Sequence, residues 1–293
     1  MIMQGGSTPV VKDAGLRAKS MKRNIRLTIE YDGTAYHGWQ SQENAVTVQD
    51  TVTAAVCRLV GESCSLTGSS RTDTGVHALG FVCNFFTESS IPADKFSFAL
   101  NTILPEDIVI KRSEEVAPEF HSRFSAIGKK YTYLIYNSAF PSALLRNRAY
   151  HVYYPLDIGA MNEAAGHFTG AHDFYAFSAS GGSAKTSVRT ITEAAVTCLS
   201  SSCGTRMESP AIPEYGDAVL GRISASGSRL IEFSIKGDGF LYNMVRIITG
   251  TLVEVGFGKL RPEDMPGIIS SLDRRKAGRT APAHGLYLSE VYY

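Results

Sequence analysis

The chain has 293 residues, of which 44% are hydrophobic and 10% aromatic, so it is long enough for one large domain or two ordinary ones around a buried core. Its 29 Lys and Arg residues against 28 Asp and Glu residues give a formal net charge of +1, which excludes a strongly basic or strongly acidic chain. A basic surface would have to be local. The densest candidates are Arg274-Arg275-Lys276 with Arg279, Lys22-Arg23, Lys129-Lys130, and Arg146 with Arg148.

Cysteine usage and hydropathy indicate the cell compartment. Five cysteines without a C-x-x-C pair favour neither a disulfide framework nor a zinc site, and they are typical of a reducing compartment. No apolar run approaches the roughly 18 residues of a membrane span, and the start lacks the layout of a signal peptide. We therefore expect a cytoplasmic protein. Residues 1–23 carry no periodic pattern, and we expect a disordered N-terminal extension there.

From residue 24 on, hydrophobic periodicity predicts alternating strands and helices. In the first half, Thr47 is the expected N-cap of a helix, and Pro92 the expected start of another. The expected elements are a strand at 24–31, a helix at 47–59, a strand at 81–86, a helix at 92–104 and a strand at 108–112.

The second half has a similar alternation. The expected elements are strands at 131–136 and 150–154, a helix at 157–168, a strand at 190–198, a long exposed loop at 200–220, a strand at 230–235, a helix at 240–255, a helix beginning at Pro262 and a strand at 286–292. This pattern predicts the α+β class, with one half at 24–124 and another at 125–293 that meet around a cleft.

The segment from Ser69 to Ala78 is the most informative part of the chain. It places Arg71 and Asp73 two positions apart among small residues that cannot form a core, which predicts a reactive loop. Gly75 can supply a positive φ for a sharp turn. Asp73 would be held in place by local bonds from hydroxyls to backbone amides, and the candidate hydroxyls are those of Ser69, Ser70, Thr72 and Thr74.

Two further patterns leave alternatives open. The run from Tyr31 to Gln40 begins like the loop of phosphatases with an aspartyl nucleophile, but Glu30 stands where the attacking aspartate would be, so a turn after a strand is the better interpretation. Its aromatic residues would either stack on bases or belong to the core. Histidines without acidic or cysteine partners at ligand spacing, such as His77 and His121, are expected to be structural.

Tyr131 and Tyr133 alternate along one strand after two lysines, so they face the same side, either in the core or toward a ligand. Arg246 lies in an otherwise apolar segment. An unpaired buried charge costs several kcal/mol, so this arginine requires an acidic partner.

Together these motifs resemble the tRNA pseudouridine synthases of the TruA type, whose catalytic aspartate lies in an R-T-D-x-G-V-H-A loop. The resemblance extends over residues 24–293. The matching segments are 31–40, the Asp73 loop, 120–133, 237–246 and 280–288.

The resemblance implies the pseudouridine synthase fold, in which two α/β halves with mainly antiparallel sheets join into a curved sheet around a central RNA-binding cleft. It also implies a homodimer and a basic cleft that takes the anticodon stem-loop of tRNA. Members isomerise uridines at positions 38, 39 and 40 of tRNA to pseudouridine, and they use no metal or organic cofactor.

The same resemblance implies roles for single residues. Asp73 would be the nucleophile, attacking either C6 of the base or C1′ of the ribose. Arg246 would lie beside it, and a cation at contact distance lowers the pKa of a carboxylate. Tyr131 would pack on the target base and help to remove the C5 proton. Arg71 would fill the space left by the flipped nucleotide or hold its phosphate, and Leu286 would form a wall of the pocket.

Thr74 stands where the family usually has alanine, and the 200–220 stretch is longer than the family's core requires. A non-catalytic tRNA-binding or tRNA-folding protein on the same scaffold is the alternative function. Such a protein would not need an intact Asp73, Tyr131 and Arg246, all of which are present.

Overall fold

The computed structural model describes residues 22–199 and 227–293. The loop expected at 200–220 lies outside these residues, as does the extension expected at 1–23 apart from its last two positions. Arg23 already belongs to the first strand, so the extension is shorter than expected at this end.

The described strands form one large sheet of ten strands, and it is mainly antiparallel, as the family resemblance implied. Its order is β4-β1-β3-β10-β5-β9-β8-β7, with β2 paired to β3 and β6 paired to β5. The strands are β1 (Arg23–Tyr31), β2 (Thr67–Gly68), β3 (His77–Thr87), β4 (Ile108–Val116), β5 (Gly128–Asn137), β6 (Tyr150–Val152), β7 (Gly170–Asp173), β8 (Val188–Cys198), β9 (Arg229–Gly237) and β10 (Leu286–Tyr292).

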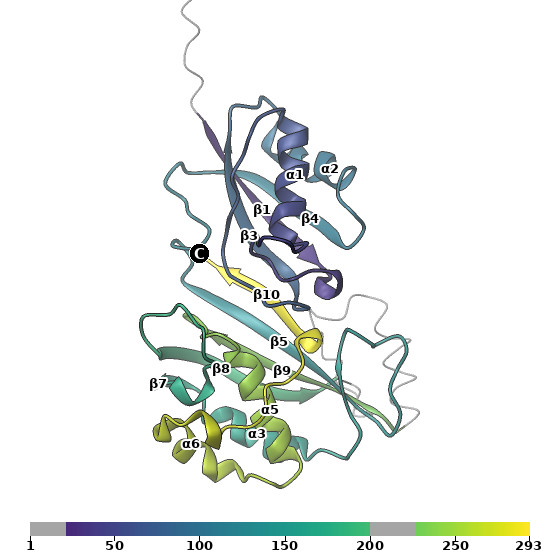
Figure 1. The fold of residues 1–293 in the computed structure, drawn as a ribbon. Helices are drawn as coiled ribbons and strands as arrows, with labels where there is room; N and C mark the ends of the chain where they lie inside the picture. Colours follow the sequence, from purple (N-terminus) through teal and green to yellow (C-terminus); the bar gives the residue numbers. More distant parts are fainter. Residues whose placement is uncertain (1–21, 200–226) are drawn as a thin grey trace, which may run out of the picture.

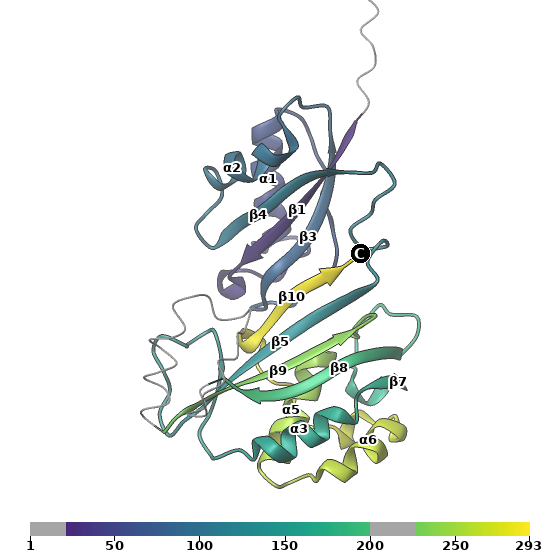
Figure 2. The same ribbon diagram turned by 180° about the vertical axis from the view of Figure 1, so that it is seen from behind.

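The α-helices pack on one face of this sheet (Figures 1 and 2). They are α1 (Val48–Val60), α2 (Phe96–Asn101), α3 (Ile158–Gly166), α5 (Met244–Gly256) and α6 (Met265–Ser271). One hydrophobic core joins them to alternate residues of the strands, such as Leu27, Tyr133 and Phe233. A smaller cluster that includes Leu134 and Tyr287 lies on the opposite face, on which no α-helix of the described residues packs and which we call the helix-free face.

Local sequence signals explain the ends of α1. The side chain of Thr47 accepts the backbone N–H of Asp50, and the backbone of Gly61 adopts a φ of 72°, which ends the helix in the left-handed region. The expected N-cap is therefore confirmed.

Several boundaries differ from the sequence predictions. β3 begins at His77 rather than at 81, so the end of the Asp73 segment is strand. α2 ends at Asn101 rather than at 104. α5 begins at Met244 rather than at 240, because Asn243 has a φ of 59° that no α-helix contains. The short strand β7 was not predicted, since four residues are too few for a periodic pattern.

The C-terminal strand β10 joins the early and late strands of the sheet (Figure 1, yellow). It pairs in parallel with β3 at Tyr287 with His77 and Leu288 with Ala78. On its other side it runs antiparallel to β5, from Leu286 opposite Tyr133 to Tyr292 opposite Gly128. This arrangement brings the loop before β3 close to α5.

The chain between α6 and β10 crosses α5 at very close range. A Cβ atom on Gly250 would lie 1.6 Å from the carbonyl oxygen of Arg279. Gly278 donates its N–H to the Thr251 hydroxyl at 2.9 Å, and Ala281 donates to the carbonyl of Arg246 at 3.0 Å. Residues 277–285, which we call the strap, therefore fix α5 to β10.

We expect Gly250→Ala to lower the free energy of unfolding by about 1–3 kcal/mol or more, because the new methyl group overlaps the strap. Gly267→Ala in α6 is the matched control, since nothing lies within 4 Å of its Cβ position. There we expect a gain of roughly 0.5–1 kcal/mol, as is usual for glycine to alanine in a helix. Thermal and urea denaturation followed by circular dichroism measure both. Equal changes in the free energy of unfolding for the two variants would contradict the close contact between α5 and the strap.

Candidate active site

The loop that carries Asp73 is held by backbone hydrogen bonds. Val76 donates its N–H to the carbonyl of Asp73 at 3.1 Å, and Gly75, with a φ of 76°, makes the sharp turn between them. Gly75 donates to the carbonyl of Tyr36, and Trp39 donates to that of Thr72, both at 3.3 Å. These bonds fix the backbone on both sides of Asp73.

The hydroxyl groups of the loop bond differently from the expectation that they bind neighbouring amides. The Thr72 hydroxyl bonds the hydroxyl of Tyr31 at 2.8 Å. The Ser70 hydroxyl lies 3.2 Å from the hydroxyl of Tyr131. Ser69 does accept an amide N–H, but from Val82 across on β3. The loop is thus attached to the sheet rather than closed on itself.

The segment from Tyr31 to Gln40 is part of the support for this loop. Tyr31 and Trp39 are buried, and the Trp39 ring stacks on Phe81 with 3.9 Å between centroids. A Cβ on Gly38 would lie 2.2 Å from the carbonyl oxygen of Thr72, and its φ is 85°, so only glycine permits the approach. Of the two interpretations of these aromatic residues, the core one is confirmed for Tyr31 and Trp39.

Asp73 and Arg246 form an ion pair between the loop and α5. The Arg246 Nη1 atom lies 3.3 Å from the Asp73 Oδ2 atom, and both side chains are largely buried. Arg246 also donates from Nε to the carbonyl of Ala281 at 2.8 Å and from Nη1 to Asn243 Oδ1 at 2.7 Å. Asp73 is therefore the acidic partner that the sequence required, and Asn243 and Ala281 orient the guanidinium group.

The pKa of Asp73 is raised above the ordinary value of a carboxyl group. Burial raises it, and the charge and hydrogen bond of Arg246 lower it, but burial has the larger effect. Arg246 lowers the pKa of Asp73, as expected, but its effect is smaller than that of burial, so the pKa is raised overall. A carboxylate held with little solvation and one cation is a better nucleophile than a solvated one.

A pocket of about 690 Å³ opens over this ion pair on the helix side of the sheet. Arg71, Tyr131 and Leu286 line it together with Asp73 and Arg246, so the structure brings all five predicted site residues together. The Tyr131 side chain is buried, and its ring packs edge-on against Phe240 at 5.0 Å. Burial raises the pKa of Tyr131 to about 12, and Ser70 opposes this by its hydrogen bond.

The pocket suits a polyanion. Besides Arg71 and Arg246, it is lined by Arg123, Lys129 and Arg189, and Phe124 and Tyr242 expose aromatic rings to the same space. Arginines of the other basic clusters form ion pairs outside this pocket. Arg275 pairs with Asp273, Arg148 with Asp32, and Arg23 with Glu115.

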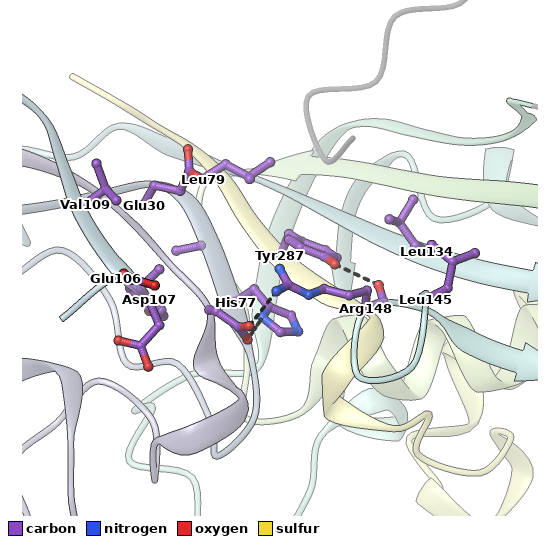
Figure 3. Close-up of a pocket in the computed structure, with 13 residues that line it drawn as sticks. Glu30, His77, Leu79, Glu106, Asp107, Val109, Leu134, Leu145, Arg148 and Tyr287 are labelled. Atoms are coloured by element: carbon purple, nitrogen blue, oxygen red, sulfur yellow. Dashed lines mark hydrogen bonds and ion pairs between the residues drawn. The ribbon is translucent and has the colours of Figure 1, made fainter. Parts of the chain in front are cut away.

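A second pocket, of about 430 Å³, lies on the helix-free face beside Leu134 and Tyr287 (Figure 3). Figure 3 shows Glu106 and Asp107 on one side of it and Arg148 on the other. Most of its charged groups are carboxylates, which repel a phosphate backbone. The first pocket is therefore the candidate active site.

No group of three or more His, Cys, Asp or Glu side chains in residues 22–199 and 227–293 has an arrangement that could hold a metal ion. Within the same ranges, no helix has both the length and the apolar character that a membrane crossing needs.

Known proteins of one family are similar to this chain over most of its length. Residues 27–125 and 164–293 match the family described as tRNA pseudouridine synthase. The chain belongs to this family. It is 57% identical to tRNA pseudouridine synthase A of Acetivibrio thermocellus over 271 residues, which are 92% of this chain and 100% of that protein. It is 53% identical to the protein of the same name from Ruminiclostridium cellulolyticum over the same shares, and 49% identical to tRNA pseudouridine synthase A 2 of Clostridium tetani over 93% of this chain.

Family membership confirms the resemblance drawn from the motifs. Three residues have contacts in the site that the sequence did not predict: Ser70, which was expected to bond a neighbouring amide, Lys129, which was named only as part of a basic cluster, and Asn243. Lys129 had a usable signal, because it precedes Tyr131 by two residues on a strand and must share its face. The contacts of Ser70 and Asn243 are long-range or depend on an unusual φ, and no sequence pattern reports them.

We expect Arg246→Met to raise the pKa of Asp73 further, because the variant removes the cation that opposes the effect of burial. The Asp73 carboxyl carbon, labelled with ¹³C and assigned with the Asp73→Asn variant, reports this pKa by NMR. Arg275→Met is the control, because Arg275 pairs with Asp273 and neither residue lines the pocket. An unchanged or lower pKa in Arg246→Met would show that the ion pair does not act on Asp73.

Proposed function

We propose that this protein isomerises uridines at positions 38, 39 and 40 of the tRNA anticodon stem-loop to pseudouridine, with Asp73 as the nucleophile. One observation carries the assignment: of the described residues that line the basic pocket, Asp73 is the only carboxylate. A nucleophile is needed to detach the base, and no other acidic group from residues 22–199 or 227–293 lines this pocket.

The reaction requires that the target nucleotide leave its helical stack, because a carboxylate at the bottom of a pocket cannot reach a stacked base. Asp73 then attacks C6 of the base or C1′ of the ribose, and the bond between N1 and C1′ breaks. The base turns within the pocket, and its C5 atom forms the new bond to C1′. The rearrangement is redox-neutral.

The surrounding side chains have roles that fit their positions. Arg246 favours the ionised form of Asp73 through its charge and their hydrogen bond. Tyr131 offers a buried ring for the base to pack on, and Leu286 forms an apolar wall. Arg71 is exposed at the mouth, 3.5 Å from the Ser183 hydroxyl, where it can contact a phosphate or fill the space that the flipped nucleotide leaves.

We propose further that the protein works in the cytoplasm, where its substrate is, and as a homodimer. Support for a dimer comes from Phe140 and Leu144, which expose 78% and 79% of their surface in the segment after β5. Leu145 of the same segment packs against the small apolar cluster of the helix-free face. Exposed apolar groups beside such a cluster are typical of protein–protein contacts.

The Asp73 assignment is tested with wild type, Asp73→Ala and Asp73→Asn on unmodified tRNA. Pseudouridine is mapped by carbodiimide treatment and primer extension, and binding is measured in parallel by filter retention. We expect modification at positions 38–40 with wild type, none with either variant, and binding within about threefold for Asp73→Asn, which keeps the shape of the side chain.

Two outcomes would contradict the proposal. Pseudouridine formed by Asp73→Ala would exclude this residue as the nucleophile. A wild-type protein that binds the tRNA and modifies no uridine would favour the alternative function, a non-catalytic tRNA-binding or tRNA-folding protein.

A further inference from the structure

Three polar side chains form a continuous hydrogen-bonded chain along one wall of the active-site pocket. The Tyr131 hydroxyl lies 3.2 Å from the Ser70 hydroxyl, and Lys129 Nζ lies 3.3 Å from the same Ser70 oxygen. Tyr131 and Lys129 are two residues apart on β5 and so share a face. Ser70 reaches them from the loop that carries Asp73. We call Tyr131, Ser70 and Lys129 the polar chain.

Tyr131 needs such a chain if it is to accept a proton. With a pKa of about 12, its hydroxyl is protonated at neutral pH, so it can take a second proton only while passing its own to another group. Ser70 is the one described residue to which the Tyr131 hydroxyl hydrogen-bonds. A serine hydroxyl donates and accepts at once, so it can pass a proton onward.

Lys129 is suited to receive that proton. Burial lowers its pKa to about 8, and the charge of Arg123 contributes to the same effect. A substantial fraction of Lys129 is therefore a neutral amine just above neutral pH. No carboxylate in the described ranges forms an ion pair with it. Besides Tyr131, the charged and titratable groups of the described residues that line the same pocket are Arg71, Asp73, His121, Arg123, Arg189, Tyr242 and Arg246.

We propose that Lys129 is the end of a proton relay that takes the C5 proton of the target uracil through Tyr131 and Ser70. This inference rests on the proposed function. As C5 bonds to C1′, the C5 proton moves to the Tyr131 oxygen, the Tyr131 proton to Ser70, and the Ser70 proton to Lys129, which becomes an ammonium ion. The electron pair of the C5–H bond enters the C5=C6 double bond of the product.

The proton count of the relay balances. Pseudouridine carries a hydrogen on N1 and none on the C5 atom that is bound to the ribose, so the reaction removes one proton from C5 and places one on N1. Water supplies the proton for N1, and Lys129 returns its proton to water before the next cycle. No oxidant, reductant or co-reactant is needed.

A plain electrostatic role is the competing explanation, in which Lys129 binds a phosphate of the RNA and carries no proton. Arginine at this position separates the two roles. It keeps the positive charge and the reach toward a phosphate, but it does not lose its proton at any pH at which the protein is folded. Lys129→Arg is therefore the decisive variant.

The test measures single-turnover rates on tRNA with uridine or 5-deuterouridine in the anticodon stem-loop. We expect Lys129→Arg to bind tRNA within about threefold of wild type and to react roughly 10²-fold more slowly, the usual size of a proton-transfer contribution. Its deuterium isotope effect should be larger than that of wild type, because proton removal becomes rate-limiting. Lys130→Arg, the neighbouring position on the other face of β5, is the control and should behave as wild type.

The pH dependence gives an independent readout. The neutral amine exists above its pKa, so the wild-type rate should fall as pH drops through about 8. The Lys129→Arg variant should not show this decrease in rate near pH 8. Ser70→Ala breaks the chain in the middle without touching a charge, and it should show the same loss of rate and the same increase in isotope effect.

A Lys129→Arg rate within twofold of wild type with an unchanged isotope effect would overturn the relay and leave Lys129 as a phosphate contact. If Lys129→Arg does not fold, a Ser70→Ala variant with normal rate and isotope effect would overturn it equally. Wild-type protein that forms no pseudouridine would refute the proposed function instead, so the two failures are distinguishable.

Discussion

The active site depends on one long-range ion pair, between Asp73 on a loop of the early strands and Arg246 on α5. Neither group is stable in a buried position alone, because desolvation of an unpaired charge costs several kcal/mol. The sheet supplies the geometry: β10 lies between β3 and β5 and brings the two segments together. Asn243 and Ala281 then fix the guanidinium group on its other sides. The candidate active site lies where these two segments meet.

Much of the architecture could be predicted from the sequence. The alternation from Ile25 to Tyr31 in β1 and the cap of α1 at Thr47 are local signals, and both are confirmed. The requirement for a partner of Arg246 follows from the energy of a buried charge alone. That the partner is Asp73 came from the family resemblance, and membership of the family is now established. The boundary between halves at residues 124 and 125 stays a prediction.

What could not be predicted depends on contacts distant in sequence or on unusual backbone angles. The late start of α5 follows from the positive φ of Asn243, a conformation that asparagine tolerates without requiring. The hydroxyls of Ser70 and Thr72 reach tyrosines on β5 and β1 rather than neighbouring amides. The net direction of the Asp73 pKa results from two opposed effects, and their balance needs the depth of burial that only the fold provides.

The pairing of β10 also has a mechanical consequence. Its ladder with β3 contains two residue pairs, whereas its ladder with β5 runs over six, and the strap holds it to α5 as well. β10 is therefore joined to β5 and α5 over a greater length than to β3, so the seam between β10 and β3 is the shorter of its two ladders. Asp73 and Arg246 stand on opposite sides of that seam. The 3.3 Å contact between the Asp73 carboxylate and the Arg246 guanidinium therefore spans the shorter ladder, and it adds a side-chain link to the two residue pairs that join β10 to β3 there.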